Sequence, residues 1–127
     1  MTMQVELVSP ERILWSGEAD MVICRTTDGE IAFLSNHAPF VGALDIGMVK
    51  IEEPGGQQTR IAVHGGFVEV SNNKVTLLSD VAEVAADIDV NRAREAKQRA
   101  EEALRTQNDA EAEAALRRAN IRLDLAS

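Results

Sequence analysis

The chain has 127 residues, of which 45% are hydrophobic and 27% charged, with 13 basic side chains against 21 acidic ones. At about 100 to 150 residues per domain, this length allows one domain or two small units and excludes a multi-domain enzyme with a separate cofactor domain. The net charge of −8 argues against non-specific binding of nucleic acid, because that affinity depends on cations that neutralise phosphates.

The composition also indicates where the protein is found. No stretch approaches the ~18 apolar residues that a membrane-spanning helix requires. The segment Met1 to Val8 lacks the basic region and apolar block of a secretion signal. Cys24 is a lone cysteine and cannot form an internal disulfide, which is typical of a reducing compartment. We therefore expect a cytosolic protein.

Residue types are distributed unevenly along the chain. Every glycine, proline and aromatic residue lies at or before Phe67, whereas the chain from Ala82 onward is rich in Ala, Glu and Arg, which favour helices. Residues 1–86 carry 5 basic and 12 acidic groups, giving −7, and residues 87–127 carry 8 and 9, giving −1. The sequence therefore predicts two units, 1–86 and 87–127.

The first 80 residues predict an all-β unit. Short alternating apolar runs recur about every ten residues with turn residues between them, which is the spacing of an antiparallel sandwich or barrel. Two pairs of runs predict hairpins, one turning at Pro54-Gly55-Gly56 and the other at Ser71-Asn72-Asn73. We expect a β-sandwich or flattened barrel with a Val/Ile/Leu core. The runs are Met3 to Val8, Met21 to Thr27, Glu30 to Leu34, Gly47 to Glu53, Thr59 to Val63, Phe67 to Val70 and Val75 to Leu78.

The last third of the chain predicts an antiparallel two-helix hairpin. Asp87 or Asp89 can cap a first helix that extends to about Arg105. A break follows at Thr106-Gln107-Asn108-Asp109, and Asp109 can cap a second helix. The apolar stripe of both helices is mostly alanine, which removes little apolar area from water at ~25 cal/mol per Å². We therefore expect a hairpin that is weakly held and able to move or to dock elsewhere.

Side chains suited to catalysis or metal binding are few, and we assign no catalytic residue. His37 and His64 stand in no metal-ligand spacing, so we expect no metal site. His64, at a predicted strand end, is expected to be structural. Cys24 lies in an apolar run and is expected to be buried and inert. Gly65-Gly66 lacks the pattern of a phosphate loop and is expected to permit a tight bend.

Arginines on the predicted helices offer a site for an anion. Arg92 and Arg99 share a face of the first helix, and Arg118 and Arg122 share a face of the second. In an antiparallel hairpin Arg92 would converge with the second pair. Such guanidinium groups can bind a polyphosphate, or an acidic protein surface. The alternative is that the arginines are solvated and pair along the helices with Glu95, Glu102 and Asp124.

One segment carries the motif of a known family. Ile88-Asp89-Val90-Asn91-Arg92-Ala93 resembles the I-D-x-x-R-A motif of the ε subunit of F-type ATP synthases. The resemblance covers the whole chain, and its landmarks are specific through their order and spacing. It implies a β-sandwich followed by a two-helix hairpin, which composition and periodicity predict independently. The other landmarks are Ser9-Pro10, Asp28 to Ile31, Asn36 to Phe40, His64 to Val70, Glu83, and Ala96 to Glu101.

The resemblance implies a non-catalytic rotor subunit that is held at a membrane only through its complex. The sandwich of such proteins sits on the γ subunit and the ring of c subunits, and Glu30 and His37 match family positions on the loops that face them. The family's hairpin folds on the sandwich or extends along γ toward the catalytic β subunits and the α subunits, where it blocks ATP hydrolysis. The implied location is the cytoplasmic face of the bacterial plasma membrane, or the thylakoid membrane in a cyanobacterium.

The resemblance also implies a regulatory ligand. In some bacterial members of the family the folded hairpin binds ATP, so ATP, with or without Mg²⁺, is expected here as a regulatory ligand and no cofactor is required. Ala93 would allow close approach, Asp89 and Glu83 would accept from adenine or ribose donors, and the arginines would neutralise phosphates. The residues implied are Glu83, Ile88, Asp89, Arg92, Ala93, Arg99, Arg118 and Arg122.

Two other classes of protein fit parts of the pattern. A small β-sandwich adaptor or ligand-binding module with a helical tail would present a row of exposed aromatic residues. The chain has one tryptophan, three phenylalanines and no tyrosine, and Phe33 and Phe67 occupy core-like positions in the alternation. An independent enzyme is the third class, and for it the sequence offers no cluster of nucleophile, base or metal ligands.

Overall fold

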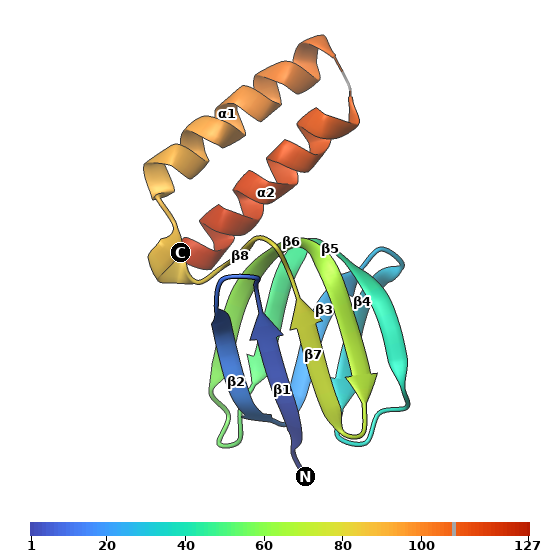
Figure 1. Cartoon of the computed structure of the whole chain (residues 1–127). Coiled ribbons are helices and arrows are strands. Elements are labelled where there is room, and N and C mark those ends of the chain that lie inside the picture. Colours follow the sequence, from blue (N-terminus) through green and yellow to red (C-terminus); the bar gives the residue numbers. More distant parts are fainter. Residues whose placement is uncertain (108) are drawn as a thin grey trace.

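Strands fill the first two-thirds of the chain and helices the remainder (Figure 1). A computed structural model describes residues 1–107 and 109–127. The fold class predicted from the sequence, a mainly β unit followed by two helices, is confirmed. The elements are β1 (Met3–Val8), β2 (Ile13–Ala19), β3 (Met21–Thr26), β4 (Gly29–Leu34), β5 (Phe40–Glu52), β6 (Gln58–Ser71), β7 (Lys74–Leu78), β8 (Ala82–Glu83), the 3₁₀ helix η1 (Ala85–Asp87), α1 (Val90–Thr106) and α2 (Ala110–Ala126).

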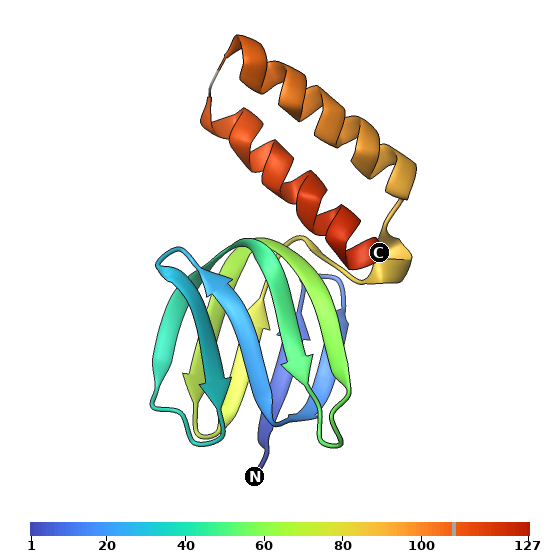
Figure 2. The ribbon, with the colours of Figure 1, turned by 180° about the vertical axis from the view of Figure 1, so that it is seen from behind.

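The strands form a sheet in the order β2-β1-β7-β6-β5-β3-β4, with β8 paired to β6. Figure 1 and Figure 2 show how this sheet curls into two facing layers. The strand pairs are antiparallel except β1 with β7, which is parallel. Apolar side chains from both layers fill the space between them. The largest fully buried ones are Phe33, Leu7, Ile51, Ile61 and Leu77.

Strand β6 is longer than the sequence analysis predicts. The runs at 59–63 and 67–70 belong to one strand that continues through Gly65 and Gly66 and pairs with β5 on both sides of them. Both glycines have positive φ, 91° and 126°. A Cβ on Gly66 would overlap the carbonyl oxygen of Leu78, so only glycine fits there. The expected tight bend is therefore a local twist within a strand, and His64 lies inside the strand instead of at its end.

The prediction that Phe67 belongs to the core is wrong, because 60% of this residue is exposed. Before the two glycines Ile61 and Val63 face the core, and after them Val68 does so. The alternation therefore shifts by one residue where the two positive φ angles occur. A one-residue shift moves every following side chain to the other face of a sheet.

The helical hairpin is docked on one end of the sandwich. Asp89 caps α1, and its Oδ1 accepts from the backbone N of Arg92 at 3.1 Å. Asp109 caps α2 in the same way, accepting from Ala112 N at 2.7 Å. Helix α2 packs against β5, β6 and η1, whereas α1 packs mainly on α2 (Figure 2). Asn108, part of the predicted break, lies outside the described residues.

Small side chains form the contact between the two helices. The buried residues of the hairpin are Ala93, Ala100, Ala112, Ala119 and Leu125. Alanine brings two helices close together but removes little apolar area from water, so packing alone holds the hairpin weakly. The docked arrangement therefore also draws on the contacts of α2 with β5 and β6 of the sandwich.

Candidate functional site

A cavity of about 260 Å³ lies where the end of the sandwich meets both helices. It exists only because the hairpin is docked, since β8, η1, α1 and α2 each supply part of its wall. The structure thus brings together all but one of the side chains that the family resemblance selects. The residues around the cavity are Glu83, Asp87, Ile88, Asp89, Arg92, Ala93, Ala96, Arg99 and Arg122.

Arg118 is the predicted residue that does not line this cavity. Its Nη2 donates to Glu111 Oε1 at 2.8 Å, along α2. Arg92 and Arg99 are on the cavity wall, and neither forms a salt bridge with a carboxylate of the described chain. The alternative pairing with Glu95, Glu102 and Asp124 is likewise absent from residues 1–107 and 109–127. Two guanidinium groups therefore face the cavity without a carboxylate partner from these segments.

The acidic side chains of the cavity already have partners. Asp89 Oδ1 is occupied by the cap of α1. Asp87 Oδ2 accepts from Arg12 Nη2 at 2.8 Å and from Val84 N at 3.1 Å, which fixes the connection between sandwich and hairpin. Glu83 Oε1 accepts from Arg122 Nε at 2.8 Å. The cavity is thus lined by carboxylates that have partners and by two arginines of α1 that form no salt bridge within residues 1–107 and 109–127.

His64 stands behind Glu83 and is the functional candidate that sequence reasoning treats only as structural. Its Nε2 lies 2.8 Å from Glu83 Oε1, and its side chain is 4% exposed. Burial lowers the pKa of His64, and this outweighs the hydrogen bond to Glu83; the charges of Arg122 and Arg118 lower it further. The neutral imidazole therefore donates its Nε2 proton to Glu83. No sequence motif links these two residues, because the contact arises from the pairing of β8 with β6.

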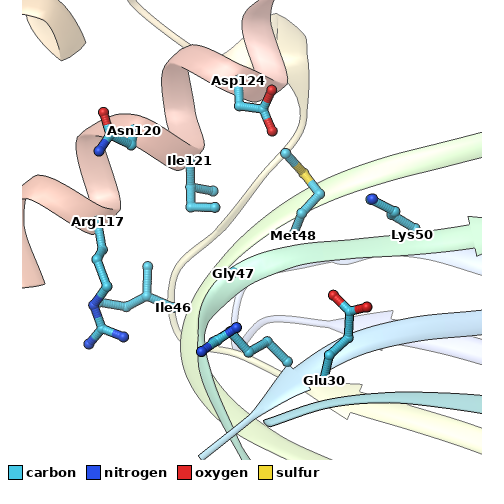
Figure 3. A pocket seen from close by; sticks show the side chains of 10 residues that line it. Glu30, Ile46, Gly47, Met48, Lys50, Arg117, Asn120, Ile121 and Asp124 are labelled. Atoms are coloured by element: carbon cyan, nitrogen blue, oxygen red, sulfur yellow. The ribbon is translucent and has the colours of Figure 1, made fainter.

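A second groove, of about 340 Å³, follows the seam between α2 and the sandwich (Figure 3). In Figure 3 Asn120 and Ile121 of α2 lie opposite Ile46 and Met48 of β5. Within this seam Arg117 Nη1 donates to Asp45 Oδ2 at 3.1 Å. The seam therefore adds a second polar contact by which the sandwich holds the hairpin.

The candidate interface residues Glu30 and His37 are not brought together. Glu30 is the second residue of strand β4, within the run predicted from Glu30 to Leu34, and it lies beside the seam with α2. His37 follows the other end of β4, where its ring packs edge-on against Phe33 at a centroid distance of 4.9 Å. Glu30 lies near the start of β4 and His37 beyond its end, so the two residues are candidates for separate contacts.

Comparison with known families covers nearly the entire chain. Residues 2–85 match the model of the "ATP synthase, Delta/Epsilon chain, beta-sandwich domain", and residues 86–127 match that of the "ATP synthase, Delta/Epsilon chain, long alpha-helix domain". The chain belongs to the ATP synthase delta/epsilon chain family. The prediction of an accessory subunit of an enzyme complex is thereby confirmed.

Individual relatives agree with the family assignment. The ATP synthase epsilon chain of Symbiobacterium thermophilum is 48% identical over 95% of this chain and 90% of its own length. That of Streptomyces coelicolor is 43% identical over 98% and 95%. A chain of the Euglena gracilis mitochondrial ATP synthase, OSCP/F1/c-ring, superposes with a TM-score of 0.73 over 98% of this chain and 76% of that chain. At 22% identity this last likeness shows the shared fold.

The sandwich of this epsilon-family chain also carries an exposed apolar row that the sequence analysis does not identify. Its members are paired in succession across neighbouring strands, so their side chains share one face. Ile13 is 61%, Leu78 50% and Phe67 60% exposed. The row is Ile13 on β2, Val8 on β1, Leu78 on β7, Phe67 on β6 and Ala43 on β5.

Among residues 1–107 and 109–127, no group of three or more His, Cys, Asp or Glu side chains is arranged to hold a metal ion. None of the described helices has the length and apolar character needed to cross a membrane.

Proposed function

We propose that this chain is the central-stalk epsilon subunit of a proton-translocating ATP synthase, where it couples the rotor to the catalytic head without taking part in the chemistry. Its partners are the γ subunit, the ring of c subunits, and the catalytic β subunits with their α neighbours. In a bacterium the complex places it at the cytoplasmic face of the plasma membrane. The family assignment over residues 2–127 supports this proposal.

The apolar row supports a docking surface for γ. A continuous apolar strip with three side chains at least half exposed is unusual on a chain that works alone, and such strips mark protein interfaces. The next row of the same face carries Glu6 on β1 and Glu69 on β6. Both are register partners of Thr76, which lies on the strand between them. A partner that covers this face therefore needs an apolar centre with basic side chains beside it. Glu30 and His37 stay candidates for contacts outside this row.

The docked hairpin supports a second role, the binding of ATP as a regulatory ligand, with or without Mg²⁺. The observation that carries this role is the cavity shared by Glu83 of the sandwich, Arg92 and Arg99 of α1, and Arg122 of α2. A triphosphate would engage Arg92 and Arg99, which lack carboxylate partners in the described chain. Asp89 and Glu83 would accept from donors on adenine or ribose.

A ligand in this cavity would favour the docked hairpin. Because the cavity needs both helices and the sandwich, ATP binds only the docked form and stabilises it by about 2.7 kcal/mol when its concentration is a hundred times the Kd. The undocked hairpin is the form that reaches the catalytic subunits and inhibits ATP hydrolysis. ATP would therefore hold back inhibition when it is abundant.

Titration of the full chain with nucleotide tests ATP binding. We expect millimolar ATP to change the chemical shifts of α1 and α2 and to raise the melting temperature. Arg92→Ala removes a guanidinium from the cavity wall and should abolish most of the response. Arg105→Ala is the matched control, because this exposed arginine lies in the last turn of α1, outside the cavity. Absence of any ATP response in the unmodified chain would refute the role.

A further inference from the structure

A buried histidine stands at the junction between the sandwich and the docked hairpin. His64 is only 4% exposed and lies in β6, one of the strands against which α2 packs. The charged groups that face it are Glu83 of β8 and Arg118 and Arg122 of α2. On the β5 side its register partner is Ile46, which carries no charge. His64 is therefore a titratable group between one acid of the sandwich and two cations of the hairpin.

The surroundings of His64 favour its neutral form. Nε2 donates to Glu83 Oε1 at 2.8 Å, while Nδ1 is buried and has no partner within the described chain. A proton added to Nδ1 would be a buried donor without an acceptor in the described chain, and it would give the ring a positive charge that Arg122 and Arg118 repel. The docked arrangement is thus built around an imidazole with a single proton.

Glu83 links this imidazole to the hairpin. Its Oε1 accepts from His64 Nε2 and also from Arg122 Nε, each at 2.8 Å. We propose that His64 is a positioning residue for Glu83, and that only its neutral form holds the hairpin docked. Protonation would repel Arg122 and Arg118 and would draw the Glu83 charge toward the imidazolium. The inference rests on the docked hairpin and stands whether or not ATP binds.

The pKa of His64 indicates the direction of the effect. In the docked form burial lowers this pKa below 6.5, and Arg122 and Arg118 add to the lowering against the opposing effect of Glu83. When α2 leaves, the two cations leave with it, whereas Glu83 remains on the sandwich and favours the charged imidazole. The pKa is therefore higher in the undocked form, and docking releases a proton. The docking constant is greatest at pH values above the undocked pKa and falls about tenfold for each unit between the two pKa values.

Distances between two spin labels on the full chain test this inference. Asp20→Cys on the sandwich and Glu102→Cys on α1 place labels at exposed positions, and Cys24→Ser removes the native thiol. As pH falls from about 8 to about 5.5, which spans the range in which histidine titrates, we expect the distance distribution to gain an undocked component. His64→Gln retains a neutral N–H donor that does not titrate, and it should stay docked throughout. His37→Gln, the matched control, should keep the pH response of the unmodified chain.

Two results would overturn the inference. One is an unchanged distance distribution in the unmodified chain across this pH range, and the other is a pH response that survives in His64→Gln. If His64→Gln does not fold, titration of the His64 ring by nuclear magnetic resonance in the unmodified chain tests the inference instead. The midpoint of this titration must coincide with release of the hairpin, and it must move to higher pH in Arg122→Gln. ATP binding is measured separately at pH 8, where the hairpin is docked. Its failure can therefore be distinguished from failure of this inference.

Discussion

Glu83 Oε1 and Arg122 Nε lie 2.8 Å apart and join β8 of the sandwich to α2 of the hairpin. Together with the pair between Arg117 and Asp45, at 3.1 Å, this contact makes up the polar attachment of α2 to the sandwich among the described residues. The side chains of Glu83 and Arg122 are 21% and 29% exposed, whereas that of Arg117 is 51% exposed. Partly exposed ion pairs contribute about 1 kcal/mol or less, so each of these two pairs adds only modestly to the attachment of the hairpin.

The first prediction concerns this attachment. Arg122→Ala should weaken docking by about 1 kcal/mol, roughly a fivefold loss in the docking constant, because Glu83 then loses its partner on the hairpin. Arg117→Ala should weaken it less, since solvent screens that pair more strongly. The measurement is the docked fraction from spin-label distances at pH 8. Equal docking in Arg122→Ala and in the control Arg105→Ala would contradict the prediction.

A second prediction concerns Gly66. Replacing it with alanine should lower the free energy of unfolding by about 2 kcal/mol or more, because the residue has φ of 126° and a Cβ there would overlap the carbonyl of Leu78. Gly55→Ala is the matched control: it also has positive φ, 97°, but no atom lies within 4 Å of the added Cβ. It should cost about 1 kcal/mol through strain alone. Urea unfolding measures both, and equal losses would show that the overlap is relieved.

Local sequence patterns predict the elements that depend on local physics. Asp89 and Asp109 cap the helices because a side-chain oxygen three residues upstream suffices to satisfy a free backbone N–H. Strand β2 is not predicted, because apolar and polar residues do not alternate along its sequence. In the structure the Trp15 ring lies beside Gly17, where an added Cβ would be 3.2 Å from the ring. The error at Phe67 also comes from glycine. Gly65 and Gly66 shift the alternation of β6 by one residue, so the side chains after them lie on the other face of the sheet.

The site itself depends on contacts that no spacing in the chain specifies. The resemblance selects most of the residues around the cavity, but it does not reveal that Glu83 is shared by Arg122 and His64. That sharing needs β8 to pair with β6 and α2 to dock over both, which are long-range events. The apolar row is hidden for the same reason, because its members come from five strands that become neighbours only in the folded sheet.

A third prediction concerns Cys24, which lies in the core with 1% of its surface exposed. Burial, and to a smaller extent the charge of Glu30, raises the pKa of its thiol to about 12. The reactive thiolate is therefore nearly absent at neutral pH, and we expect labelling by a disulfide reagent to proceed only as fast as the sandwich opens. Stopped-flow labelling in native buffer and in urea measures this. Rapid labelling of the native chain would show that the thiol is accessible.

The fourth prediction addresses the apolar row as the docking surface for γ. Phe67→Ser should weaken the complex with γ at least fivefold, because an exposed aromatic at the centre of an interface contributes about 1 kcal/mol or more, while the fold should persist since the side chain is outside the core. Leu34→Ser is the matched control, an apolar residue 58% exposed on β4, away from the row. Isothermal titration calorimetry with purified γ gives the affinities. Equal affinities for the two variants would place the γ contact elsewhere on the sandwich.

The fifth prediction separates docking on the rotor from inhibition. A chain that ends at residue 86 keeps the apolar row but lacks both helices, so it should assemble into the complex and raise the rate of ATP hydrolysis. The truncation removes Asp87 and its pair with Arg12, which is worth less than about 1 kcal/mol because both side chains are at least one-third exposed. Hydrolysis by the reconstituted complex is the measurement. An unchanged rate in the assembled complex would remove the inhibitory role, whereas failure to assemble would show that the hairpin contributes to docking on the stalk.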